Sequence, residues 1–130
     1  MSALIDTDRA VDYLKGIPEA QALLRSLLDD GVAISIVTYA EVCEGIFYGS
    51  DPTRHERVFK NFLRGTQVMA ISRPVAERFA RIRGDLRRRG ELLPMADLII
   101  AATALEHDLT LVTRNIRQFE RIDGLRLSRR

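Results

Sequence analysis

Several residue types that carry chemistry are rare in this 130-residue sequence, which has one cysteine, two histidines and no tryptophan. The single cysteine, Cys43, cannot form an internal disulfide and is typical of a reducing compartment. We interpret it as a small buried side chain rather than a nucleophile, because no activating base is evident. His55 and His107 have neither HxxxH nor Cys/His spacing, so a zinc site is not expected.

Long hydrophobic runs and phosphate-binding loops are also missing. No segment reaches the ~18 consecutive apolar residues of a membrane span. The first residues lack the basic-then-apolar pattern of a secretion signal. The sequence contains neither a glycine-rich phosphate loop nor a GxSxG motif. We therefore expect a cytoplasmic protein with no membrane segment.

The composition is that of an ordinary globular protein, with 46% hydrophobic and 29% charged residues. A chain of this length can bury a core without disulfides, and we expect one domain over residues 1–130. The net charge is only +2, but 18 of the 20 basic residues are arginine. Arginine binds phosphate in a bidentate manner, so this bias is compatible with a nucleic-acid partner and equally with compositional drift.

Apolar strand-like runs alternate with helical patterns, and no repeat or linker divides the chain. This alternation predicts an α/β fold with a central parallel sheet of four to five strands flanked by helices on both faces. The expected strands are residues 2–6, 32–37, 67–71 and 109–113, with 125–127 as a further edge strand. Helices are expected from residue 7 to near Gly16, from Pro18, after Thr38, from Pro52, from Pro74, over 95–107 and over 116–119.

Three carboxylates lie where expected strands give way to helices: Asp6, Glu41 and Asp97. The carboxyl ends of parallel strands line one crevice, so these groups can meet there despite their separation in sequence. Carboxylate oxygens without a nearby lysine suit a hard divalent cation. We interpret Asp6 as functional, whereas Asp8, or alternatively Thr7, is expected to cap the helix that follows, and Asp8 could also support the site.

The sequence indicates a function more strongly for Asp97 than for Glu41. Asp97 lies at the head of an almost wholly apolar helix, where a carboxylate needs a metal ion or a helix N-terminus as a partner. Glu41 lies three residues after Thr38, which is the spacing of a capping box, and capping explains it as well as catalysis does. Glu44 lies one turn further on the same face and ranks below Glu41.

Two further features flank the predicted crevice. Asn115 follows the last main strand, and its amide can offer an oxygen to a metal or its water, or can cap the short helix after it. An arginine cluster on the long helix from Pro74 could guide a phosphodiester backbone or form a solvated surface. The cluster comprises Arg81, Arg83, Arg87, Arg88 and Arg89.

Four motifs, in this order and spacing, resemble the PIN-domain nucleases over essentially the whole chain. They are Leu4-Ile-Asp-Thr-Asp8, Ser35-Ile-Val-Thr-Tyr-Ala-Glu-Val42, Leu93-Pro-Met-Ala-Asp-Leu-Ile-Ile-Ala-Ala-Thr-Ala104 and Leu111-Val-Thr-Arg-Asn-Ile-Arg-Gln-Phe119. The chain length is similar to that of the small bacterial and archaeal VapC-type toxins of toxin–antitoxin pairs. The resemblance implies a PIN-like three-layer sandwich.

The resemblance also implies an acidic centre that binds magnesium or manganese. On this basis we expect a metal-dependent endoribonuclease in which Asp6 and Asp97 hold the cation. Glu41 would orient a water or accept its proton, and Asn115 would help to hold the outer shell of the metal.

The expected partners are an RNA substrate, a cognate antitoxin protein that blocks the crevice, and a second copy of the chain. The residues suggested for the homodimer surface are Ile46, Phe47 and Tyr48.

Two positions depart from the family pattern. Asn115 stands where the family often has aspartate, which lowers the charge of the site and favours one firmly held metal over two. Arg9 stands where the family usually has an apolar residue, and it could pair with Asp8 or Asp12, contact RNA or compete with the metal. A PIN fold that has lost activity and serves as a binding module is therefore an alternative.

A phosphotransfer domain is the less favoured alternative, since an acidic pair after a first strand also marks receiver and dehalogenase-like domains. Both usually need a lysine at a later strand end, and the only lysines here are Lys15 and Lys60. The dehalogenase-like pattern also has threonine where this chain has Ala10.

Overall fold

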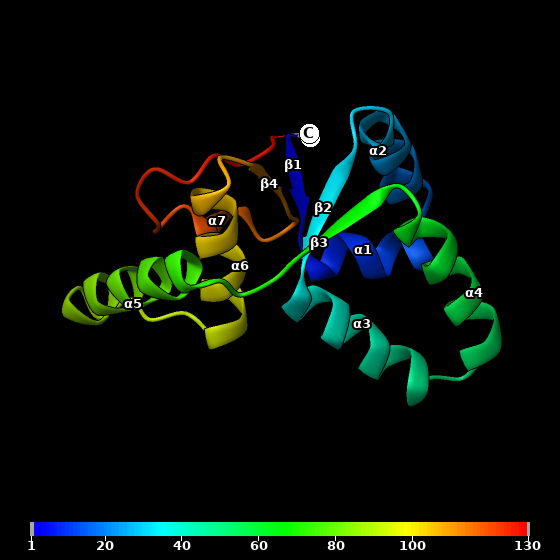
Figure 1. Cartoon of the computed structure of the whole chain (residues 1–130), viewed down its shortest axis with the longest axis horizontal. Coiled ribbons are helices and arrows are strands. Elements are labelled where there is room, and N and C mark those ends of the chain that lie inside the picture. Colours follow the sequence, from blue (N-terminus) through cyan, green and yellow to red (C-terminus); the bar gives the residue numbers. More distant parts are fainter. Residues whose placement is uncertain (1, 130) are drawn as a thin grey trace.

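A computed structural model describes residues 2–129, and within them the central element is a four-stranded parallel sheet (Figure 1). The strands are β1 (Ala3–Ile5), β2 (Val32–Ser35), β3 (Thr66–Met69) and β4 (Thr110–Val112). They lie in the order β3-β2-β1-β4, and each neighbouring pair is parallel. The chain therefore winds outward from β1 in both directions, and open α/β sheets place their ligand crevice at such a point.

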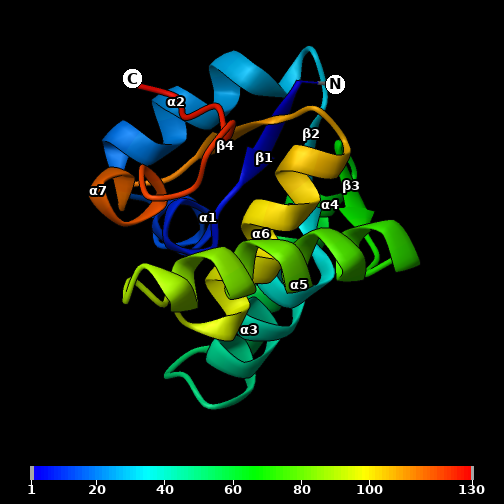
Figure 2. The ribbon, with the colours of Figure 1, turned by 90° about the vertical axis from the view of Figure 1, so that its left-hand side faces the viewer.

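Helices cover both faces of the sheet, as Figures 1 and 2 show. One face packs against α1 (Thr7–Leu14), α2 (Pro18–Leu28), α3 (Ile36–Phe47) and α4 (Pro52–Leu63). The other face packs against α5 (Arg73–Arg88), α6 (Met95–Glu106) and α7 (Ile116–Phe119). The predicted three-layer α/β sandwich is confirmed.

The alternation of side chains along the strands separates two cores. Ile5 and Ile34 pack with residues of α1 to α4, whereas Leu4 and Ala33 point to the opposite face and pack with α5 to α7. Helix α6 is buried over most of its surface because it lies between the sheet and α5, and its hydrophobic residues accordingly show no single apolar stripe. Cys43 is half-buried and packs at the edge of the α1–α4 core, as a small apolar side chain would.

The predicted boundary between the second strand and its helix is wrong. β2 ends at Ser35 rather than at Val37, because the Ser35 hydroxyl accepts a hydrogen bond from the Val37 N–H at 3.0 Å and caps α3. Thr38 is therefore not the N-cap but a fully buried residue in the first turn of α3. Glu41 in turn is not in a capping-box position.

The cap of the first helix and the fifth strand also differ from prediction. Asp6, rather than Asp8 or Thr7, is the N-cap of α1. Residues 125–127 do not form an edge strand, and a single parallel bridge joins Leu127 to Leu111. Within residues 2–129, no helix has the length and apolar character needed to cross a membrane.

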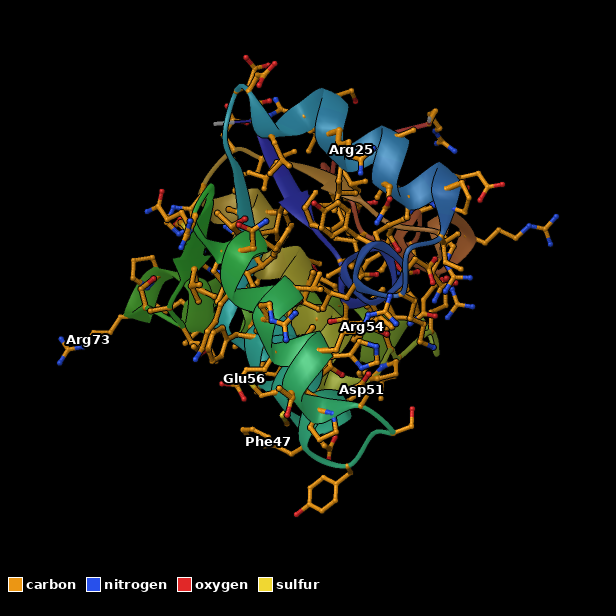
Figure 3. All side chains as sticks on the ribbon, turned by 90° about the vertical axis from the view of Figure 1, so that its right-hand side faces the viewer. Arg25, Phe47, Asp51, Arg54, Glu56 and Arg73 are labelled. Atoms are coloured by element: carbon orange, nitrogen blue, oxygen red, sulfur yellow. The ribbon has the colours of Figure 1, made fainter. Side chains whose placement is uncertain are left out.

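The suggested dimer surface needs one correction. Phe47 and Tyr48 are 65% and 88% exposed, but Ile46 is only 5% exposed and belongs to the α1–α4 core. Ile46 lies on the inner side of α3, so it cannot present an apolar surface to a second copy. Figure 3 shows Phe47 on the outside of the molecule, beside α4.

Replacing Ile46 by alanine should lower the free energy of unfolding by about 2 kcal/mol, because buried contacts are lost and a cavity remains. Ile71→Ala is the matched control, since the same atoms are removed from a side chain that is 46% exposed; we expect a loss below about 1 kcal/mol there. Urea denaturation followed by circular dichroism measures both. Equal losses would contradict the core position of Ile46.

Candidate active site

The Asp6 carboxylate is buried where two adjacent strands end. It follows β1 directly and is only 5% exposed. Its Oδ1 accepts a hydrogen bond from the Thr7 N–H at 2.8 Å, and its Oδ2 accepts one from the Thr113 hydroxyl at 2.6 Å. Thr113 follows β4, which pairs in parallel with β1. The sheet thus joins side chains that are 107 residues apart in sequence.

The Asp97 carboxylate reaches the same edge of the sheet from the first turn of α6. It is half-buried, and its Oδ2 accepts a hydrogen bond from Nε2 of Gln118 on α7. The Gln118 Oε1 accepts a hydrogen bond from Nδ2 of Asn115. A carboxylate can only accept, so the Gln118 NH2 must face Asp97 and its oxygen must face Asn115. Asn115 does not cap α7 with its side chain, and it is linked to Asp97 through Gln118.

The Glu41 carboxylate comes to this edge from α3 and is exposed to solvent. Its Oε1 accepts a hydrogen bond from the Thr7 hydroxyl at 2.6 Å. The Thr7 Oγ1 also lies 2.9 Å from Oγ1 of Thr38, which reaches it from the first turn of α3. Within the described residues, Glu44 makes no hydrogen bond or ion pair with these groups. This agrees with the expectation that Glu44 is a weaker candidate for the site than Glu41.

Asp8 lies beside this group and is held by the loop after β4 rather than acting as a cap. Its Oδ2 accepts hydrogen bonds from the Arg114 N–H at 3.1 Å and from the Thr113 hydroxyl at 3.4 Å. The Arg114 guanidinium lies 2.9 Å from Asp12 and 3.9 Å from Asp8. Arg114, and not Arg9, therefore pairs with these two acids; the Arg9 Nε is buried and has no hydrogen-bond partner among the described residues.

The carboxylates of the site lie close enough to repel one another. Burial, followed by the charges of Asp8 and Asp97, raises the pKa of Asp6 to about 6, against the opposing effect of the Thr113 hydrogen bond. Burial also raises the pKa of Asp97, with further contributions from the charges of Glu41 and Asp8. Among residues 2–129, neither Asp6 nor Asp97 has an ion-pair partner. The centre of the site is therefore an acidic cluster without a protein cation.

A family model described as the PIN domain matches residues 3–125 of this chain. The chain belongs to the PIN-domain family.

Curated relatives of this PIN domain are similar to it over nearly its whole length. It is 30% identical over 124 residues to the tRNA(fMet)-specific endonuclease VapC of Salmonella typhimurium, covering 95% of this chain and 94% of the relative. It is 34% identical over 119 residues to Ribonuclease VapC1 of Methanocaldococcus jannaschii, covering 92% of this chain and 79% of the relative. Within the PIN-domain family, the chain belongs with the VapC ribonucleases.

Solved structures share its fold closely. The VapBC2 complex of Rickettsia felis bound to a promoter DNA fragment superposes with a TM-score of 0.90 at 26% identity, covering 98% of both chains. The DNA-bound VapBC complex of Salmonella typhimurium superposes with a TM-score of 0.90 at 29% identity, covering 98% of this chain and 97% of that one. The PIN-like fold expected from the sequence motifs is therefore shown, and a phosphotransfer fold is excluded.

The donor chemistry of this PIN-domain site fits a hard divalent cation. Asp6 and Asp97 supply carboxylate oxygens, and no cationic group among residues 2–129 neutralises them. Within residues 2–129, no three acidic, imidazole or thiol side chains converge as a ready-made metal cluster. Mg²⁺ does not need one, since it usually keeps several waters and takes one or two carboxylates from the protein.

The predicted arginine cluster is divided by its ion pairs. Arg88 pairs with Asp85, and Arg89 pairs with Glu91 and donates to the Arg121 carbonyl oxygen. Among the described residues, the other members have no ion-pair partner; they are Arg81, Arg83 and Arg87. Figure 3 shows Arg73, at the start of the same helix, extending away from the molecule. Arg73 and the three unpaired members of the cluster therefore remain available to phosphate groups.

Three contacts of the site are not predicted from the sequence. The role of Gln118 had one signal, since it lies three residues after Asn115 and so shares a helix face with it. The signal for Thr113 was weaker, since it was the last residue of the expected fourth strand. No feature of the sequence indicated the contact between Thr38 and Thr7, because Thr38 was expected to cap the helix instead.

Asp6→Asn should stabilise the protein at neutral pH in the presence of EDTA. The pKa of Asp6 is raised from 3.8 to about 6 in the folded state, so stability present below pH 4 is lost as the pH rises through about 6. Asparagine removes the buried charge, and we expect a gain on the order of 2 kcal/mol, or about 5 °C in Tm, at pH 7.5.

Calorimetric melting curves between pH 4 and pH 8 measure this effect, and the gain should disappear near pH 4. Asp30→Asn is the control, because Asp30 is an exposed aspartate remote from the site. An Asp6→Asn gain that does not depend on pH would show that the Asp6 charge is not its cause.

Proposed function

We propose that this PIN domain is a magnesium-dependent endoribonuclease that acts as the toxin of a toxin–antitoxin pair. The observation that carries the proposal is the acidic cluster at the carboxyl ends of β1 and β4, where Asp6 and Asp97 have raised pKa values and no ion-pair partner in the part of the chain that the structure describes. The ribonuclease names of the VapC relatives support RNA as the substrate, and the VapBC complexes support a toxin role.

In this mechanism, Asp6 and Asp97 hold the cation and Glu41 acts on the water. A bound divalent cation supplies Lewis-acid activation of the scissile phosphate and of the attacking water. Glu41 orients that water or accepts its proton, and the Thr7 hydroxyl fixes the position of its Oε1. The Asn115 oxygen, turned away from Gln118, is available to a water of the cation. Arginines on α5 position the RNA backbone.

We further propose that an antitoxin protein binds this PIN domain at its active site. The antitoxin would cover the acidic crevice with a basic side chain, and the similarity to the VapBC complexes supports such a partner. We also infer a homodimer, a cytoplasmic location and a single PIN domain over residues 1–130.

Asp97→Asn should abolish magnesium-dependent RNA cleavage, with a loss of at least ~100-fold, because one of the two direct cation ligands is removed. Labelled RNA incubated with purified protein, in the presence of Mg²⁺ or EDTA, gives the rate. Asp123→Asn is the matched control, since the Asp123 side chain is 97% exposed. Full activity of Asp97→Asn would overturn the assignment of this ligand.

Titration of Mn²⁺ by calorimetry tests the alternative of a binding module without activity. The active-site proposal expects binding that is lost in both Asp6→Asn and Asp97→Asn and kept in Asp123→Asn. A wild-type protein that neither binds Mn²⁺ nor cleaves RNA would favour the binding module.

The homodimer surface can be tested at its two exposed aromatic residues. Phe47→Glu with Tyr48→Glu should halve the mass measured by light scattering, because charged side chains would replace the apolar contact. Ile17→Glu is the control, since Ile17 is an exposed apolar residue at the turn between α1 and α2. A double variant that keeps the wild-type dimer mass would place the interface elsewhere.

A further inference from the structure

The Thr38 hydroxyl is buried and contacts a neighbouring helix. Thr38 is fully buried in the first turn of α3. A threonine hydroxyl inside a helix usually donates to the carbonyl four residues earlier. Thr103 on α6 does so, with its Oγ1 2.8 Å from the Ile99 carbonyl oxygen. Thr38 lies in the first turn of α3, where the residue four positions earlier, Ile34, belongs to β2, and its hydroxyl reaches across to α1, where it lies 2.9 Å from Oγ1 of Thr7.

The direction of the hydrogen bonds follows from the end of this chain of groups. An ionised Glu41 carboxylate can only accept, so the single hydroxyl hydrogen of Thr7 is committed to Glu41 Oε1 at 2.6 Å. Thr7 can then only accept from Thr38, and Thr38 must be the donor. The order is Thr38 to Thr7 to Glu41, with each hydroxyl polarised by the next acceptor.

We propose that Thr38 is a positioning residue, which acts through Thr7 to hold the Glu41 carboxylate in its catalytic orientation. The proposal rests on the proposed function and adds a residue that touches neither substrate nor cation. Glu41 is exposed, and a single hydrogen bond to an exposed side chain fixes it only weakly. A buried donor anchored in α3 fixes the Thr7 hydroxyl, and therefore gives Glu41 one preferred position.

Thr38→Val tests this role, because valine keeps the shape of threonine and removes only the hydroxyl. We expect kcat to fall about fivefold, the equivalent of one neutral hydrogen bond, while KM stays unchanged. Thr38→Ser restores the hydroxyl and should recover most of the rate. Thr103→Val is the matched control, since it removes a fully buried threonine hydroxyl that bonds only within its own helix, and it should leave kcat unchanged.

A double variant tests whether the two hydroxyls act in series. Thr7→Val removes the bond to the charged group and should lower kcat about thirtyfold. The Thr7→Val, Thr38→Val double variant should lose no more than Thr7→Val alone, since Thr38 has no route to Glu41 once the Thr7 hydroxyl is gone. Losses that multiply would overturn the series arrangement.

A measurement without catalysis separates this inference from the proposed function. The side-chain carboxyl ¹³C signal of Glu41 should shift in Thr38→Val and stay in place in Thr103→Val. A wild-type protein that cleaves RNA while Thr38→Val keeps full kcat and an unshifted Glu41 signal would overturn the role of Thr38 alone. A wild-type protein that cleaves no RNA would overturn the proposed function, and the Glu41 signal would still decide whether Thr38 positions that carboxylate.

Discussion

The burial of the Asp6 carboxylate at the end of the central strand is the constraint on which the site depends. β1 lies between β2 and β4, so a side chain that ends this strand is enclosed by the sheet and its helices. Burial and the neighbouring charges of Asp8 and Asp97 disfavour the ionised form of this residue. Its hydrogen-bond donors, the Thr7 N–H and the Thr113 hydroxyl, are neutral and do not cancel its charge. The buried charge of Asp6 therefore destabilises the folded state at neutral pH. Carboxyl groups whose pKa is perturbed in this way are characteristic of functional sites.

The two other carboxylates are oriented by the same device, a chain of neutral donors. Asn115 donates to Gln118 and Gln118 to Asp97, while Thr38 donates to Thr7 and Thr7 to Glu41. Each chain ends on a group that can only accept, so the position of every hydrogen in it is determined. Each chain of donors also joins two different helices, α7 with α6 in one case and α3 with α1 in the other. Neutral donors orient the acids without neutralising them, and the crevice therefore keeps the negative charge that a cation requires.

The α/β class, the parallel sheet and the crevice at its carboxyl edge could be predicted, because they follow from the period of the apolar residues and from the strand-end rule. The start of α3 could not, since Ser35 and Thr38 are both good caps and the β-branched Ile36 and Val37 between them favour a strand. Tertiary packing determines the boundary between β2 and α3, since Val37 packs against the α5–α7 core from the first turn of the helix. The link from Gln118 to Asp97 likewise depends on where α7 lies relative to α6, which no local pattern specifies. The same applies to Arg114, which pairs with Asp8 and Asp12, whereas the sequence left pairing with these acids as one of three alternatives for Arg9.

The charges of the site are arranged in two layers that respond differently to their surroundings. Arg114 is half-exposed and neutralises Asp8 and Asp12 at the rim, so these pairs are screened by salt and contribute little to stability. Asp6 lies deeper, where burial is the main cause of its raised pKa and salt screens its charge less than it screens the rim. Arginines at the rim and on α5 can therefore attract a polyanion in a salt-dependent manner, while the affinity of the interior for a small cation depends on burial. Asp8 couples the two layers, because it pairs with Arg114 at the rim and its charge also raises the pKa of Asp6. A change in the rim ion pairs should therefore alter cation binding as well as RNA binding.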